Sequence, residues 1–249
     1  FNYMKHASDY GITLDSDPKP DFEGIVKRSR NSAADMSKGI QYLFKKNKIE
    51  HIAGEGKLLK GKKVEVKDKN GKTKEYNADH IIIATGARSK ELPNLKQDGK
   101  KIFGYRKAMT LEKLPGSMVI VGSGAIGSEF AFFYNSMGVE VTLVEFLPHL
   151  VPLEDEEVSK QLERSFKKAK MKVMTNSSVE SVDTKGKKCK VKIKTKKGEE
   201  TVEADVVLSA VGIQANIENI GLEDVGIKVE KDKIKVDDYY RTNVEGYYA

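Results

Sequence analysis

The segment Val119–Glu145 constrains the fold of this 249-residue chain more than any other feature. A β-branched run leads into Gly122-Ser123-Gly124-Ala125-Ile126-Gly127. In the G-x-G-x-x-G pattern the first glycine permits a tight turn, the second lets a pyrophosphate approach the backbone, and the third lets the helix pack closely. The helix directs its free N–H groups at the phosphates. The pattern predicts a strand over 118–121, a helix over 124–137 and a strand over 139–145. Together they are expected to bind a dinucleotide; the alternative is a tight turn that binds nothing.

Glu145 ends the second of these strands, 145 − 127 = 18 residues after Gly127. An acid about 20 residues after the glycines is expected where the adenosine ribose binds. Its carboxylate can accept hydrogen bonds from both ribose hydroxyls and repels a 2′-phosphate. Phe146, Leu147 and Pro148 follow, so no arginine adjoins the acid. The pattern favours NAD(H) over NADP(H), with a solvated strand-end carboxylate as the alternative for Glu145.

The segments before this unit predict a helix and a set of strands. Apolar residues recur at helical spacing over 21–47, which predicts one long helix with an apolar stripe. Alternating strands are expected over 49–76, with a two-residue hairpin turn at Asn70-Gly71 because both residue types tolerate positive φ. The β-branched run within 78–86 predicts a strand buried on both faces. An irregular crossing is expected over 87–117.

The segments after the glycine motif repeat this order. A helix is predicted over 154–170, then short strands with a turn near Gly198, then a closing strand over 204–212. Both closing strands begin with Ala-Asp and end in glycine, and Asp79 and Asp205 are 205 − 79 = 126 residues apart. We interpret the similarity as a domain-scale repeat of two dinucleotide-binding folds; chance similarity of two buried strands is the alternative.

Composition narrows the class of protein. The net charge is +7, from 44 Lys+Arg against 37 Asp+Glu, but the lysines are spread over hairpins without interleaved aromatic residues. We therefore expect solvated surface and neither nucleic acid nor membrane as a partner. No apolar run approaches the ~20 residues of a membrane helix. Cys189, the single cysteine, excludes an internal disulfide and a zinc cluster, and weakly favours a reducing compartment. The four histidines have no acidic or cysteine partners at spacings typical of metal or catalytic sites, so no metal site is predicted.

Four motifs occur in an order that resembles the pyridine nucleotide-disulfide oxidoreductases, most closely the dihydrolipoyl dehydrogenases among them. These are Ala84-Thr85-Gly86-Ala87-Arg88, the glycine motif with Ser128-Glu129, Val141-Thr142-Leu143-Val144-Glu145, and Ala210-Val211-Gly212. The resemblance implies an α/β fold in which a Rossmann-like NAD-binding domain, with a central parallel sheet and a β-meander crossover, is inserted in a partial FAD-binding domain of the same type. The domains would be 1–112 (FAD), 113–233 (NAD) and 234–249 (return to the FAD domain).

The resemblance also implies site residues and an activity. Gly56, Thr85, Gly86 and Ala87 would lie on the FAD side. The NAD side would comprise Gly122, Ser123, Gly124, Ala125, Ile126, Gly127, Glu129, Glu145, Val179 and Gly212. The dihydrolipoyl dehydrogenases, the members that this sequence most resembles, oxidise protein-bound dihydrolipoamide and reduce NAD⁺ through FAD and a redox disulfide. Glu129 would lie near the junction of nicotinamide and flavin; a solvated first-turn acid is its alternative. The implied partners are a second copy in a homodimer and the lipoyl domain of a 2-oxoacid dehydrogenase or glycine cleavage complex, in the cytoplasm, or in the mitochondrial matrix of a eukaryote.

Several family features have no counterpart in this sequence. The first G-x-G-x-x-G, which binds FAD, and the redox cysteine pair are absent, and Ile213-Gln214-Ala215-Asn216 departs from the usual Gly-Arg-x-Pro-Asn. We therefore expect part of a longer enzyme, with the NAD site, an incomplete FAD site, no catalytic residue and no activity of its own. The alternatives are another NADH-dependent disulfide, mercuric or coenzyme A-disulfide reductase, a transhydrogenase, and a non-catalytic nucleotide-binding module.

Overall fold

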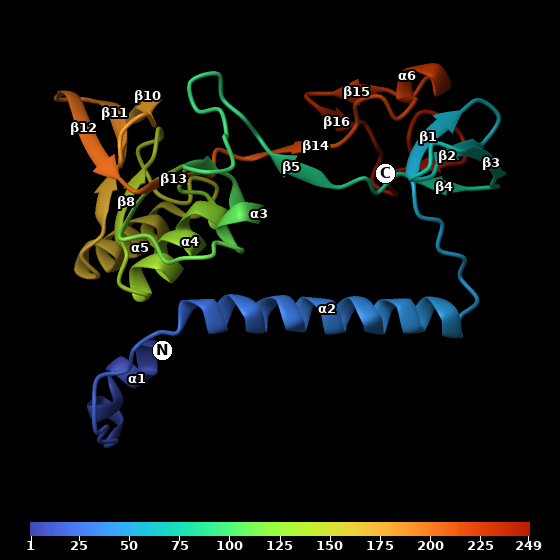
Figure 1. The fold of residues 1–249 in the computed structure, drawn as a ribbon. Coiled ribbons are helices and arrows are strands. Elements are labelled where there is room, and N and C mark those ends of the chain that lie inside the picture. The colour runs from blue at the N-terminus through green and yellow to red at the C-terminus, as the bar shows by residue number, and fades with distance from the viewer. The chain divides into compact units, whose positions relative to one another are not determined.

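The structure of the protein is a computed structural model that describes residues 1–249, apart from the side chain of Asn2 (Figure 1). The chain forms two compact units, each made of two segments. The first unit contains Phe1–Ala34 and Ser89–Gly212, and the second contains Asp35–Arg88 and Ile213–Ala249. The long helix α2, Phe22–Lys46, begins in the first unit and ends in the second, and it confirms the helix expected over 21–47.

A five-stranded parallel sheet forms the centre of the first unit, which confirms the predicted α/β fold. Its strand order is β6-β13-β7-β8-β9. The strands are β6 (Ile102–Phe103), β13 (Val206–Ser209), β7 (Ser117–Val121), β8 (Glu140–Val144) and β9 (Lys172–Met174). All five residues of β7 are buried, as expected of a central strand covered on both faces. β6 is an additional sheet strand inside the segment predicted to be irregular.

Helices and an antiparallel sheet complete the first unit. The helices are α1 (Asn2–Lys5), the 3₁₀ helix η1 (Ala7–Tyr10), α3 (Tyr105–Ala108), α4 (Ala125–Ser136) and α5 (Glu156–Lys168). The antiparallel strands are β10 (Ser178–Asp183), β11 (Cys189–Thr195) and β12 (Gly198–Ala204). Asp155 caps α5 by accepting hydrogen bonds from the N–H groups of Glu157 and Val158 at 2.8 and 3.3 Å. The strand–helix–strand unit and the helix after it are confirmed within about two residues at each end, the usual uncertainty of helix boundaries.

Alternate side chains of β7 enter two separate cores. Met118 and Ile120 pack with the buried residues of α4 and α5, including Tyr134 and Phe166. Their neighbours Val119 and Val121 pack instead with the antiparallel strands β10–β12. This division follows from the period of two along a strand. The sheet is therefore fixed between a helical layer and a β-meander, and the residues at the end of β7 have little freedom to move.

The second unit consists of short strands around a smaller core. Its meander is β1 (Glu55–Leu59), β2 (Lys63–Lys67) and β3 (Thr73–Asn77), and β4 (Ile81–Ile82) pairs in parallel with β17 (Tyr247–Tyr248). The remaining elements are β5 (Ala87–Ser89) paired with β14 (Ile213–Ala215), β15 (Val229–Glu230) paired with β16 (Lys233–Ile234), and α6 (Leu222–Val225). Leu58, Ile81, Leu222, Ile227 and Tyr247 form the buried core.

Two expectations for the second unit are wrong in detail. The segment 78–86 forms a strand of only two residues. Ile82 is 75% exposed, because successive side chains of a strand point to opposite faces and only the face of Ile81 packs on the core. The hairpin at Asn70-Gly71 is wider than predicted: β2 and β3 last pair at Lys67 and Thr73, and Gly71 adopts φ +82 while Asn70 does not adopt positive φ. The carboxylate of Asp68 accepts hydrogen bonds from two N–H groups within the turn, which stabilises the longer loop.

The apolar stripe of α2 is buried only at the start of the helix. Phe22 packs on the rings of Phe133 and Tyr134, with centroid distances of 6.5 and 6.3 Å. Further along, Met36 and Ile40 are exposed. The order of a three-stranded meander followed by a parallel-paired strand occurs in both units, as β1–β4 and as β10–β13, in agreement with the Ala-Asp repeat of the sequence.

Candidate functional site

A groove of about 670 Å³ lies at the carboxyl ends of β7, β8 and β13 in the first unit. Ligands of open parallel sheets bind at this edge. The lining residues come from these strand ends and from the loops beside them: Leu92, Asn94, Leu95, Val121, Gly122, Ser123, Gly124, Val144, Glu145, Phe146, Leu147, Pro152, Leu153, Ser177, Ser178, Val179, Glu180, Ala210, Val211 and Gly212. Six of the predicted site residues therefore share one cavity: Gly122, Ser123, Gly124, Glu145, Val179 and Gly212.

The three glycines of the motif differ in what a Cβ at each position would meet. Gly122 has φ +95, and a Cβ there would lie 2.5 Å from the carbonyl oxygen of Ala210. A Cβ on Gly127 would collide with the carbonyl oxygen of Gly122. The packing of the protein itself thus requires glycine at these two positions. Gly124 has an ordinary backbone conformation, and a Cβ there would meet nothing within 4 Å.

The open space at Gly124 lies beside the start of a helix, where a phosphate group could bind. Gly124 is the N-cap of α4, a helix of 12 residues, and it lines the groove. It has no side-chain capping bond, so the first N–H groups of α4 have no side-chain acceptor from the cap. A pyrophosphate oxygen would satisfy such groups and would interact favourably with the helix dipole. The groove therefore offers a dinucleotide the expected place for its pyrophosphate.

Glu145 is buried at the end of β8, with 6% of its surface exposed. Its Oε2 accepts hydrogen bonds from the N–H and the hydroxyl of Ser123, both at 2.7 Å, and its Oε1 accepts one from the N–H of Leu147 at 2.8 Å. These contacts fix the carboxylate at the wall of the groove. A solvated strand-end carboxylate, the alternative for this residue, does not agree with its burial.

The charge of the groove is negative. Glu145 and Glu180 are its only charged lining residues, and none of the lining residues described is an arginine or a lysine. Phosphate monoesters are usually held by arginine or lysine. The lining therefore offers no cationic side chain to a phosphate monoester.

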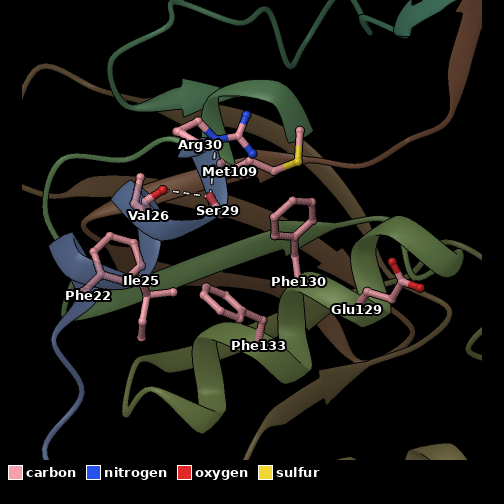
Figure 2. A pocket seen from close by; sticks show the side chains of 10 residues that line it. Phe22, Ile25, Val26, Ser29, Arg30, Met109, Glu129, Phe130 and Phe133 are labelled. Carbon is pink, nitrogen blue, oxygen red and sulfur yellow. Dashed lines mark hydrogen bonds between the residues drawn. The ribbon is translucent and has the colours of Figure 1, made fainter. Parts of the chain in front are cut away.

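Four of the predicted NAD-side residues do not line the groove. Ala125, Ile126 and Gly127 lie in the first turn of α4 behind Gly124. Glu129 borders a second cavity of about 290 Å³, which is mostly apolar and is formed by α2, α3 and α4 (Figure 2). Its carboxylate points away from the rings of Phe130 and Phe133 in this view. The alternative for Glu129, an exposed acid in the first turns of α4, agrees with its exposure.

The FAD-side residues lie in the second unit and contact other parts of that unit. The carbonyl oxygens of Thr85 and Gly86 accept hydrogen bonds from the side chain and the N–H of Asn216, at 3.1 and 3.0 Å. Gly56 lies in β1, where a Cβ would have only an ordinary contact with Val64. Ala87 begins β5. These four residues do not by themselves outline a flavin site.

Arg88 and Glu218 form a bidentate ion pair in the second unit. The guanidinium donates to the two carboxylate oxygens at 2.6 and 3.0 Å. Hydrogen bonding to Arg88 lowers the pKa of Glu218 to about 2. A depressed pKa in the folded state means that the pair stabilises the protein above the unfolded pKa, near 4.5, and that this stabilisation is lost as the pH falls toward 2.

Replacement of Glu218 should reveal this pH dependence. Glu218→Gln is expected to lower the melting temperature at pH 6, as followed by circular dichroism. Between pH 4.5 and 2 the melting temperature of this variant should fall less than that of the wild type. Both side chains are about half exposed, so the shift should be small and should shrink in high salt. Glu245→Gln, which removes an exposed carboxylate from the same unit, is the matched control. Parallel pH profiles of Glu218→Gln and the wild type would contradict the prediction.

Sequence reasoning missed the far wall of the groove. Leu92, Asn94 and Leu95 belong to the loop after β5, and the amide of Asn94 donates a hydrogen bond to the carbonyl of Val179. Phe146 and Leu153 also line the groove although they are 72% and 98% exposed. Large exposed apolar residues are a signal for ligand contact, and Phe146 directly follows the predicted acid. No local sequence pattern points to the loop of Asn94.

The remaining chemistry of the chain is limited. Among the residues described, no group of histidine, cysteine or acidic side chains could hold a metal ion. Cys189 is a free, buried thiol in β11, and burial raises its pKa. No helix in the described part of the chain is long and apolar enough to cross a membrane.

Comparison with known proteins agrees with this geometry. The family model of the pyridine nucleotide-disulphide oxidoreductases matches residues 5–249. A dihydrolipoyl dehydrogenase of Rhizobium etli is 40% identical over all of this chain and 55% of its own length. Dihydrolipoyl dehydrogenase 2, mitochondrial, of Arabidopsis thaliana is 34% identical, with 50% of its length covered. Among solved structures, LpdA from Mycobacterium tuberculosis has a TM-score of 0.89 and 30% identity over 99% of this chain and 54% of its own.

The fold and the matches define a class of redox protein. The chain belongs to the pyridine nucleotide-disulphide oxidoreductase family. Its relatives are of the dihydrolipoyl dehydrogenase type, and the chain spans about half the length of the curated relatives it matches. The family is one of flavoproteins that also bind a pyridine nucleotide, which confirms the resemblance noted in the sequence at this level.

Proposed function

We propose that the groove of the first unit binds NAD(H) and that the chain is the central part of an NAD-dependent dihydrolipoyl dehydrogenase. The observation that carries the proposal is the combination of open space beside Gly124 with the buried acid Glu145 and no lysine or arginine in the lining. Gly124 and the first turn of α4 would hold the pyrophosphate, and Glu145 would accept a hydrogen bond from the adenosine ribose. Phe146, Leu153 and Val179 would cover the adenine.

The roles of the remaining predicted residues follow from this assignment. When bound, the nicotinamide supplies the ring carbon that accepts or donates a hydride; the protein positions it and excludes water. Ala125 and Ile126 would support the pyrophosphate and Gly212 would close the groove. We assign 113–233 to NAD, and 1–112 with 234–249 to an incomplete FAD site that includes Gly56, Thr85, Gly86 and Ala87. Glu129 would lie toward the flavin in the whole enzyme.

The whole enzyme would oxidise the dihydrolipoamide of a lipoyl domain, as a homodimer in the cytoplasm or the mitochondrial matrix. The relatives named dihydrolipoyl dehydrogenase support this substrate. This polypeptide contains a single cysteine, which is buried, so it lacks a dithiol that could exchange with lipoamide. We therefore expect it to bind NADH without lipoamide-dependent turnover; NADH formation from dihydrolipoamide by this chain alone would contradict that.

Calorimetric titration tests the NAD assignment. NADH is expected to bind at least about tenfold more tightly than NADPH, a difference of about 1.4 kcal/mol, because a 2′-phosphate would meet the charge of Glu145. Glu145→Ala should weaken NADH binding and reduce the preference. A wild-type chain that binds neither nucleotide, or binds NADPH more tightly, would overturn the proposal.

A further inference from the structure

We infer that Ser123 is a positioning residue that sets the nucleotide preference of the groove through Glu145. The inference rests on the proposed function, since it concerns how the same groove recognises the ribose. Ser123 is the variable residue between the first two glycines of the motif, and its side chain is completely buried. Its hydroxyl and its N–H both donate to Oε2 of Glu145 at 2.7 Å.

The hydrogen bonds that Glu145 accepts restrict the orientation of its carboxylate. A carboxylate has about four lone-pair sites. Ser123 occupies both sites of Oε2, and the N–H of Leu147 occupies one site of Oε1. A single acceptor site then remains, on Oε1. In this geometry Glu145 accepts one hydrogen bond from a ribose rather than one from each hydroxyl.

The hydroxyl of Ser123 also links the loop after β7 to the end of β8, a link that a side chain without a donor would lack. Ser123 lies in the loop after β7, and Glu145 directly follows the neighbouring strand β8. The backbone N–H of Ser123 would still bond to Oε2 in an alanine variant, but the second bond to that oxygen would be lost. A carboxylate held by fewer hydrogen bonds can rotate about its last torsion, which is broad and roughly two-fold. Its charge would then no longer be fixed where the 2′ position of the ribose lies.

Ser128 provides a matched control in the first turns of α4, next to the loop of Ser123. Its buried hydroxyl donates to the carbonyl oxygen of Ser123 at 2.9 Å and does not contact Glu145. Ser128→Ala therefore removes one buried serine hydrogen bond next to the motif but leaves the contacts of the carboxylate in place. General loosening of the loop would affect both variants, whereas loss of positioning would affect only Ser123→Ala.

Calorimetric titration of the full chain with NADH and NADPH tests the inference. Loss of a hydrogen bond to a charged group should reduce the ratio of NADH to NADPH affinity in Ser123→Ala by about fivefold to tenfold. Ser128→Ala should keep the wild-type ratio. In a Glu145→Ala background, Ser123→Ala should change the ratio no further, because its effect passes through the carboxylate. Thermal melting verifies folding, and Ser123→Cys, which keeps the size but donates weakly, replaces any alanine variant that fails to fold.

The outcomes separate this inference from the proposed function. If the wild type prefers NADH and Ser123→Ala keeps that preference, the inference alone is overturned. It is also overturned if Ser128→Ala shifts the ratio equally, or if Ser123→Ala shifts it equally without Glu145. A wild-type chain that binds neither NADH nor NADPH overturns the proposed function, and the inference with it.

Discussion

Gly124→Thr is expected to weaken NADH binding about 100-fold, which corresponds to about 2.8 kcal/mol, while the fold stays intact. A Cβ at this position meets no protein atom within 4 Å, and the backbone of Gly124 is extended in ψ, at φ −60 and ψ −177. The side chain would therefore occupy the space in which we place the pyrophosphate. The threonine hydroxyl would in addition bond to the free N–H groups of α4, the donors that a phosphate would use.

The stability of this variant distinguishes a blocked ligand site from a damaged fold. Threonine and glycine are about equally good N-caps, so the free energy of unfolding should change by less than about 0.5 kcal/mol. Asp155→Thr is the matched control, since it places the same residue at the N-cap of α5 outside the groove lining. Its NADH affinity should equal that of the wild type. Wild-type NADH affinity in Gly124→Thr would show that the pyrophosphate does not lie at this helix end.

The parts of the site that local pattern predicted without the family resemblance, which supplied Val179 and Gly212, are those built by residues close together in the sequence. The turn after β7, the N-terminus of α4 and the acid at the end of β8 all lie within one continuous segment, and hydrogen bonding between neighbouring strands brings Glu145 to Ser123. The wall at Asn94 depends on the path of a loop that contacts β10 through Val179, far away in the sequence. Such a contact follows from tertiary packing and leaves no local pattern.

The mistaken expectations have the same physical origin. A β-branched run such as that of Ile81–Ile83 indicates a strand that can be buried, but burial on both faces needs a packed layer over each face. In the described chain the small core packs on the face of Ile81, and Ile82 on the opposite face is exposed. The hairpin at Asn70-Gly71 is likewise widened by the hydrogen bonds that Asp68 accepts within the turn, which the two turn residues alone do not indicate. Local pattern fixes the type of an element better than it fixes what that element faces.

Gly127→Ala is expected to destabilise the folded chain by about 3 kcal/mol, although it adds only one methyl group. The new Cβ would collide with the carbonyl oxygen of Gly122 and would lie 3.3 Å from the Cβ of Ala210. The first obstacle is backbone, and Gly122 is itself held by a hydrogen bond from its N–H to the carbonyl of Val144 at 2.8 Å. The start of α4 would have to move away from the sheet, and the buried contacts of Ala131 and Tyr134 would be disturbed.

Urea denaturation without nucleotide measures this loss, and the same substitution at Gly39 is its control. Gly39 lies within helix α2, and a Cβ there would meet nothing within 4 Å. Because alanine is the better helix former, Gly39→Ala should stabilise the chain by up to about 1 kcal/mol. The two glycine-to-alanine changes should thus differ in sign. If Gly127→Ala left the free energy of unfolding unchanged or raised it, close packing would not explain the third glycine, and its role would have to lie in ligand binding, like that proposed for Gly124.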